Sequence, residues 1–79
     1  MLLLCMPNYL HADESLLALS AGKHLVLEKP VGISPEETDA LYHAAVKSEK
    51  KTVVSFLIRW VPLVANLKHL VESGAIGDV

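Results

Sequence analysis

Cysteine is nearly absent from this 79-residue sequence, which contains Cys5 alone and therefore excludes a disulfide within the chain. A single thiol inside an apolar segment is typical of a buried, reduced cysteine, so we expect a cytoplasmic protein. The histidines are also too scattered to form a metal site, since no pair has the spacing of zinc ligands on a helix. The sequence therefore predicts no metal.

Neither sign of charge dominates, with 7 basic and 9 acidic residues and a net charge of -2. The basic residues form no stripe of the kind that binds nucleic acid or an anionic membrane, so we expect neither partner. The apolar run at residues 2–6 has no preceding basic residues and stops at Pro7-Asn8. It is too short for a signal peptide or a membrane span, and we interpret it as a buried strand.

Glycine is present at only four positions, Gly22, Gly32, Gly74 and Gly77, and these form no G-x-G-x-x-G pattern. A phosphate-binding turn of that kind is thus absent from the chain. The sequence likewise has no G-x-S-x-G elbow for a serine nucleophile, which leaves hydrolase functions with little support.

What the sequence does contain is a strand-then-helix pattern that occurs three times. The apolar runs cover residues 2–6, 24–28 and 52–57, and each leads through a turn into a helical pattern. Successive units of this kind predict a parallel sheet. Because the runs are nearly continuous rather than alternating, we expect a doubly wound α/β sheet covered by helices on both faces.

The three helices are predicted from their ends and their apolar spacing. The first begins with Asp13 and Glu14 in its first turn and stops at Gly22, with an inner stripe at Leu10, Leu17 and Ala21. The second begins at a capping box in residues 34–37 and runs to about 47–50. Its inner stripe is Leu41, Ala44, Ala45 and Ser48. The third follows a turn at residues 59–62 and ends at Gly74.

The most informative feature is the tripeptide Glu28-Lys29-Pro30 at the end of the second strand. Open parallel sheets bind ligands in the crevice beyond the carboxyl ends of their strands. Proline biases its predecessor to an extended backbone, so Lys29 is aimed into that crevice rather than absorbed into a helix. The alternative is a surface lysine paired with Glu28. Pro30 is either a plain strand stop or a deliberate kink with a cis Lys29-Pro30 bond.

Five short motifs occur in an order and spacing that resemble the Gfo/Idh/MocA oxidoreductases, the relatives of glucose-fructose oxidoreductase and inositol dehydrogenase. They are Pro7-Asn8-x-x-His11, Ala21-Gly22-Lys23-His24, Glu28-Lys29-Pro30, Arg59-x-x-Pro62 and Gly74-x-Ile76-Gly77. The resemblance covers essentially the whole chain, and the ordered set is far more specific than any one motif.

The resemblance implies the later half of an NAD(P)-binding Rossmann domain at residues 1–58. Residues 59–79 would then be a connecting helix that leads toward a second α/β domain. The expected function is hydride transfer between NAD or NADP and a sugar, polyol or related hydroxyl or carbonyl substrate. The complete protein would be a homo-oligomer. The family's glycine-rich turn and its downstream Asp and His are not in this chain, so we expect the chain alone to be inactive. Two alternatives stay open, a non-catalytic binding or structural module and a non-functional truncated chain.

The resemblance also suggests roles for individual residues. Lys29 would be the catalytic residue, with its ammonium beside the nicotinamide ribose and the substrate oxygen, where it stabilises an alkoxide or relays a proton. The cofactor-binding set would be Pro7, Asn8, His11, Glu28, Lys29, Pro30 and Arg59.

Each of these residues also has a simpler interpretation. Glu28 could be a satisfied carboxylate at a strand end, and Asn8 a helix cap. His11 could be a partly exposed residue of a first helical turn. Arg59 could form an ion pair instead of contacting a carboxamide, a phosphate or a polyol. We expect Trp60 to serve packing or a domain interface.

Overall fold

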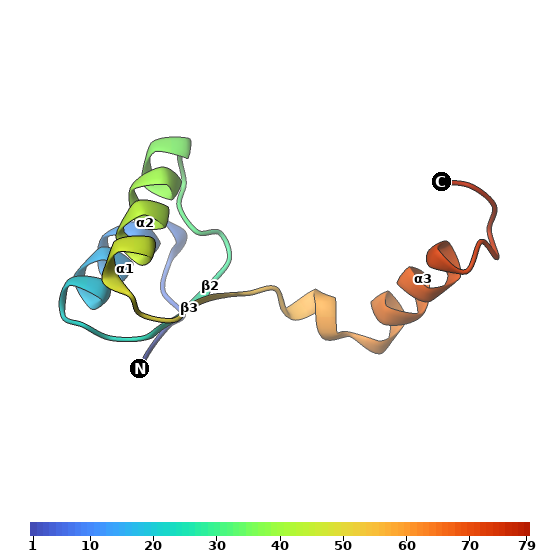
Figure 1. Ribbon diagram of the computed structural model, residues 1–79, viewed down its shortest axis with the longest axis horizontal. Coiled ribbons are helices and arrows are strands. Elements are labelled where there is room, and N and C mark those ends of the chain that lie inside the picture. The colour runs from blue at the N-terminus through green and yellow to red at the C-terminus, as the bar shows by residue number, and fades with distance from the viewer.

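The computed structural model describes residues 1–79 and contains one parallel sheet of three strands (Figure 1). The strands are β1 (Leu2–Leu4), β2 (Leu25–Glu28) and β3 (Thr52–Ser55), in the order β1-β2-β3. In the register, Leu27 of β2 lies opposite Leu4 on one side and Val54 on the other. The predicted parallel α/β arrangement is thus confirmed, although each strand is shorter than the apolar run that predicted it.

Helix α1 (His11–Ser20) follows a short 3-10 helix, η1 (Asn8–Leu10). Its buried residues are His11, Ala12, Ser15, Ala18 and Leu19. The predicted inner stripe was wrong at Leu17, whose side chain is 64% exposed, and at Ala21, which is exposed and follows the last residue of the helix. The buried positions include 11, 15, 18 and 19, which follow helical spacing one face away from the predicted stripe. Small side chains on this face let α1 approach the sheet closely.

Helix α2 (Pro35–Ser48) begins as the capping box predicts. The Ser34 side-chain oxygen accepts a hydrogen bond from the backbone N–H of Glu37 at 3.2 Å. The Glu37 carboxylate reaches back to accept from the N–H of Ile33 at 2.7 Å, one residue earlier than in the standard box. The predicted inner stripe is confirmed, since Leu41 is buried and the other three members of the stripe, Ala44, Ala45 and Ser48, are half-buried.

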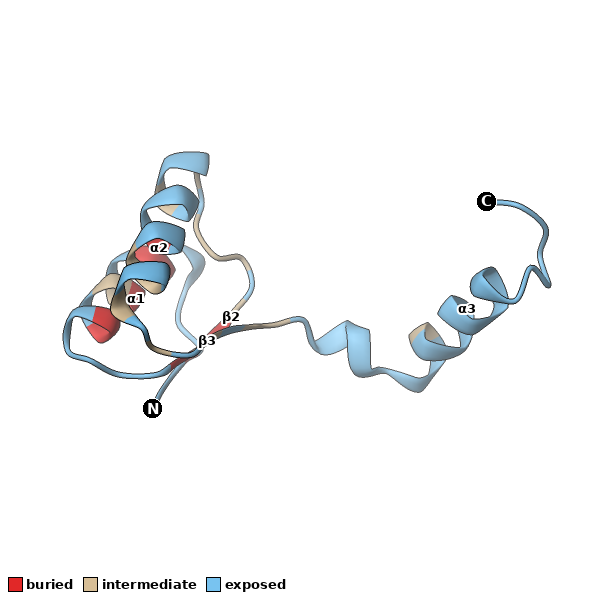
Figure 2. Ribbon diagram, viewed as in Figure 1, coloured by how far each residue is buried: buried red, intermediate tan, exposed pale blue.

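Both helices pack on the same face of the sheet and against each other (Figure 2). The core between them and the sheet consists of Leu4, Ala18, Leu19, Leu25, Leu27 and Leu41. On the other face, Leu3 is 62% exposed and Val53 is 55% exposed. Within this chain the helices therefore cover one face, as in an incomplete, three-strand part of a doubly wound sheet. The strands follow one another across the sheet in chain order, so right-handed crossovers place both connecting helices on the same face. The sheet has no further strand on the far side of β1, and so no helix that connects to such a strand covers the second face.

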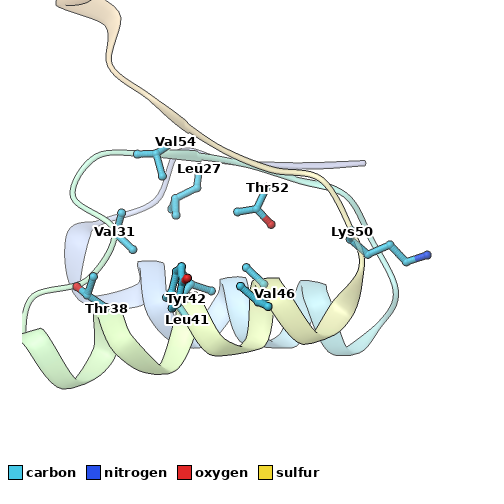
Figure 3. Close-up of a pocket in the computed structure, with 10 residues that line it drawn as sticks. Leu27, Val31, Thr38, Leu41, Tyr42, Val46, Lys50, Thr52 and Val54 are labelled. Carbon is cyan, nitrogen blue, oxygen red and sulfur yellow. The ribbon is translucent and has the colours of Figure 1, made fainter.

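An apolar cavity of about 410 Å³ lies between α2 and the outer part of the sheet (Figure 3). Leu27, Thr52 and Val54 extend into it from the strands. Leu41 and other side chains of α2 face them from below. The cavity is on the covered face of the sheet, and Glu28, Lys29 and Pro30 do not line it.

The last part of the chain projects away from the sheet (Figure 1). A second 3-10 helix, η2 (Leu57–Trp60), follows β3 and leads into α3 (Pro62–Glu72). No residue of α3 is buried, and the molecule measures 48 Å along its longest axis but 25 Å along the next. None of the helices has the length and apolar character needed to cross a membrane.

Candidate functional site

The carboxyl ends of the three strands meet at one edge of the sheet, and Glu28-Lys29-Pro30 lies in the middle of that edge. Glu28 is the last residue of β2 and is paired with Ser55 of β3. The Lys29-Pro30 peptide bond is cis. This agrees with the interpretation of Pro30 as a kink with a cis bond rather than a plain strand stop.

Lys29 is exposed, and its ammonium has no carboxylate partner. The Glu28 carboxylate instead accepts a hydrogen bond from the backbone N–H of Lys29 at 3.0 Å. The one ion pair in the structure joins Lys68 and Glu72 on α3. The alternative of a lysine paired with Glu28 is thus not what the structure shows, and the lysine head group remains available to another molecule.

A cavity of about 220 Å³ lies beside Lys29. Its lining consists of Glu28 and Lys29 from the end of β2 and of Phe56, Leu57 and Ile58 from the segment after β3. An apolar wall with a cation and a carboxylate at its rim suits a flat, weakly polar ring that carries a polar substituent.

His11 is buried, with 1% of its surface exposed, and its ring joins two segments at this edge. Nδ1 lies 2.5 Å from the carbonyl oxygen of Pro30, and Nε2 lies 2.7 Å from that of Met6. The alternative of a partly exposed first-turn residue was wrong. The helical spacing of His11 with Ser15, Ala18 and Leu19 is the signal that could have indicated its burial.

Pro7 and Asn8 are exposed and follow β1 at the same edge of the sheet. The carbonyl of Pro7 accepts a hydrogen bond from the N–H of Leu10 at 3.0 Å and so begins η1. The interpretation of Asn8 as a helix cap was wrong, since the residue before α1 is Leu10 and no side chain caps that helix.

Arg59 is exposed in η2 and does not line the cavity beside Lys29. It lines a different, open cavity with Trp60 and three residues of α3, Val64, Ala65 and Lys68. Arg59 forms no ion pair, so that alternative was wrong as well. Within this chain, the structure groups Glu28, Lys29 and Pro30 with His11 and leaves Arg59 apart.

Both long helices that begin at this edge carry acidic residues in their first turns. These are Asp13 and Glu14 in α1 and Glu36 and Glu37 in α2. Helix N-termini attract phosphate through their free N–H groups and dipole, but neighbouring carboxylates oppose a second anion. This part of the edge therefore suits the uncharged end of a ligand better than a pyrophosphate.

Comparison with known proteins shows which family the chain belongs to. Residues 1–56 match the family model of the Gfo/Idh/MocA proteins, described as an oxidoreductase family with an NAD-binding Rossmann fold. Levoglucosan dehydrogenase of Pseudarthrobacter phenanthrenivorans is 41% identical over 73 residues, which are 92% of this chain and 19% of that protein. D-glucoside 3-dehydrogenase of Escherichia coli is 32% identical over 75 residues, or 95% of this chain and 21% of that protein.

Solved structures agree with the sequence relatives. The scyllo-inositol dehydrogenase of Lactobacillus casei superposes with a TM-score of 0.84 and 30% identity, covering 96% of this chain and 23% of that structure. Coverage this complete includes the projecting α3, so the extended arrangement also occurs in a much longer protein. The chain spans about a fifth of the length of these relatives. From the match over residues 1–56 and the similarity of these dehydrogenases, the chain belongs to the Gfo/Idh/MocA family of oxidoreductases, which have an NAD-binding Rossmann fold.

Proposed function

We propose that this chain forms the nicotinamide-facing and substrate-facing part of an NAD(P)-dependent dehydrogenase. One observation carries the proposal: an unpaired lysine, Lys29, lies at the carboxyl end of the central strand beside a cavity with an apolar wall. Residues 1–58 would be the later half of the Rossmann domain, and residues 59–79 the connection toward a second domain. The projection of α3 away from the sheet supports this division.

The residues at the edge fit one end of the cofactor. Phe56, Leu57 and Ile58 would form the wall for the nicotinamide ring, with Glu28 and Lys29 at its rim. Pro7, Asn8 and Pro30 would line the same edge, and Arg59 would contact a part of the cofactor or substrate that extends beyond the Lys29 cavity, since it lines a separate cavity with α3. The cofactor, when bound, supplies the hydride chemistry. The acidic first turns of α1 and α2 support a separate site for the pyrophosphate.

Lys29 would act on the substrate oxygen. Its ammonium has no carboxylate partner, so it can donate a hydrogen bond to a hydroxyl oxygen and stabilise the negative charge that develops there during oxidation. It could also accept the hydroxyl proton when the amine is neutral. Its backbone is held by the Glu28 carboxylate on one side and by Pro30 on the other, which limits the positions that the side chain can reach.

The substrate class follows from the relatives. Their names describe dehydrogenases of levoglucosan, of D-glucosides and of scyllo-inositol, which are sugars or a cyclic polyol. We therefore propose a small polyhydroxylated substrate for the protein that contains this chain. Its recognition would draw on residues outside the 79 described here as well as on Lys29.

A chimera tests the proposal with the full chain present. The 79 residues replace the matching segment of levoglucosan dehydrogenase, and levoglucosan oxidation is followed by the absorbance of the reduced nicotinamide with NAD⁺ and NADP⁺. We expect an active chimera. In it, Lys29→Ala should lower kcat by about 10²-fold or more, while the affinity for the cofactor changes little. Lys29→Arg should restore little of the kcat that is lost in Lys29→Ala, since guanidinium does not give up a proton and has a different shape from an ammonium group.

Two variants serve as controls. Lys23→Ala removes another exposed lysine, at the opposite end of β2, and should leave kcat unchanged. Glu28→Gln removes the carboxylate charge but keeps an oxygen that can accept from the Lys29 N–H, so it separates the charge from the hydrogen bond. A folded chimera whose kcat is the same with and without the Lys29 amine would refute the catalytic role.

A further inference from the structure

Both hydrogen-bond partners of the His11 ring lie in the connections at the carboxyl edge of the sheet. Its two partners are the carbonyl oxygens of Met6, in the segment after β1, and of Pro30, in the turn after β2. Neither partner belongs to a strand or to α1. An apolar residue would be enough to pack α1 on the sheet, so the choice of a buried imidazole needs another explanation.

The geometry points to His11 as a positioning residue for Lys29, acting through the carbonyl of Pro30. This inference rests on the proposed function of Lys29. His11 itself is 1% exposed and both of its ring nitrogens face backbone carbonyls, so it contacts neither the cavity beside Lys29 nor a ligand in it. Its effect on chemistry is therefore indirect.

Lys29 lies between two anchored neighbours. On its amino side, Glu28 is paired with Ser55 in the sheet. On its carboxyl side, the Pro30 carbonyl lies 2.5 Å from His11 Nδ1. With both neighbours held, the direction of the Lys29 Cα–Cβ bond is set by the backbone, even though its exposed side chain has no partner of its own. A displacement of about 1 Å at such a group is enough to cost roughly 10²-fold in rate.

The loop beyond Pro30 is held from the other helix. The Glu37 carboxylate of α2 accepts from the N–H of Ile33 at 2.7 Å, and Gly32 lies directly against the first turn of α2. His11 thus anchors the near end of this loop from α1, and Glu37 anchors its far end from α2. Of the two anchors, His11 is the one next to Lys29.

The two ring contacts can be separated by substitution. A carbonyl oxygen only accepts, so a ring nitrogen can hydrogen-bond to it only as a donor, and which of the two nitrogens carries the N–H depends on the tautomer. In His11→Asn the side-chain amide nitrogen takes the place of Nδ1 and can still donate to Pro30. In His11→Gln it takes the place of Nε2 and can donate to Met6 instead. Both variants carry a side-chain amide, but His11→Asn keeps the hydrogen bond to Pro30, beside Lys29, and His11→Gln keeps the one to Met6, after β1. A comparison of the two variants therefore separates the effects of these two hydrogen bonds.

The experiment uses both variants in the dehydrogenase chimera that holds the full chain. We expect His11→Asn to keep kcat within about threefold of the unsubstituted chimera, and His11→Gln to lower it by about 10- to 10²-fold. KM for the cofactor and the unfolding temperature should be similar in the two variants. Equal losses of kcat in both, or losses that follow the unfolding temperature, would overturn the proposal and leave His11 a purely structural residue.

A second measurement does not depend on activity. Hydrogen exchange is followed at the amides of Lys29 and Ile33, which donate to the carboxylates of Glu28 and Glu37. We expect faster exchange at Lys29 in His11→Gln than in His11→Asn, with Ile33 changing less because Glu37 still holds it. Unchanged exchange at Lys29 in His11→Gln would overturn the proposal even if the chimera is inactive. An inactive but folded chimera with the expected exchange would instead count against the catalytic role of Lys29.

Discussion

Replacing Gly32 by alanine is the sharpest test of how the loop after Lys29 is held. A Cβ at position 32 would lie 2.8 Å from Cβ of Glu37 and 3.3 Å from the backbone nitrogen of Thr38. Carbon atoms in favourable contact are about 3.5–4.0 Å apart, so the new methyl group comes roughly 0.7 Å too close. Both neighbours belong to the first turn of α2 and cannot rotate away. The loop and the helix must therefore separate.

The cost can be worked out from these contacts. Overpacking of a tight site costs about 1–3 kcal/mol. Separation would also break the hydrogen bond from Ile33 to the Glu37 carboxylate, which adds about 0.5–1.5 kcal/mol. We expect Gly32→Ala to destabilise this part of the fold by about 2–4 kcal/mol. Since the same loop begins at Lys29-Pro30, kcat should fall as well.

Thermal unfolding and steady-state kinetics of the dehydrogenase chimera measure both effects. A drop of several degrees in the unfolding temperature is expected for Gly32→Ala. Glu37→Ala is the matched control, because it removes the carboxylate but keeps the Cβ that causes the clash. Adding it to Gly32→Ala should therefore give no rescue. A Gly32→Ala chimera that unfolds at the temperature of its parent would refute the close packing of loop and helix.

Three further predictions concern the chain itself. The isolated 79-residue chain should bind NAD(H) and NADP(H) very weakly, because it has no glycine-rich turn and its helix N-termini carry carboxylates; calorimetry that finds micromolar binding would contradict this. The isolated chain should self-associate through its uncovered sheet face and unpaired strand edges. Val53→Lys on that face should reduce the association measured by sedimentation. A monodisperse monomer of the unsubstituted chain would contradict this prediction. Ser15→Ala should leave the stability of the chimera unchanged or raise it by about 1 kcal/mol in denaturant unfolding, since the buried Ser15 hydroxyl has no hydrogen-bond partner; a clear loss of stability would reveal one.

Several features could be predicted from the sequence because they depend on neighbours within one or two helical turns. The capping box places the start of α2 correctly, since Ser34 and Glu37 meet whenever the helix begins there. The apolar runs indicate three parallel strands, and the strand that ends at Glu28 puts Lys29 at the carboxyl edge of the sheet. For the same reason the Glu28-Lys29-Pro30 motif indicates both the family and the position of the candidate site.

Other features depend on segments that are distant along the chain, and only the tertiary structure decided them. The buried side chain of His11 hydrogen-bonds to the carbonyl of Pro30, 19 residues later in the chain. The apolar runs do not reveal that helices cover just one face, because that depends on the direction of the crossovers and on the number of strands in the sheet. Lys29 directly follows the second strand, whereas Arg59 lies within η2 after the third strand and lines a cavity with α3 rather than the Lys29 cavity. Local sequence thus determines where each element ends, whereas the packing of the elements determines which of those ends form a site.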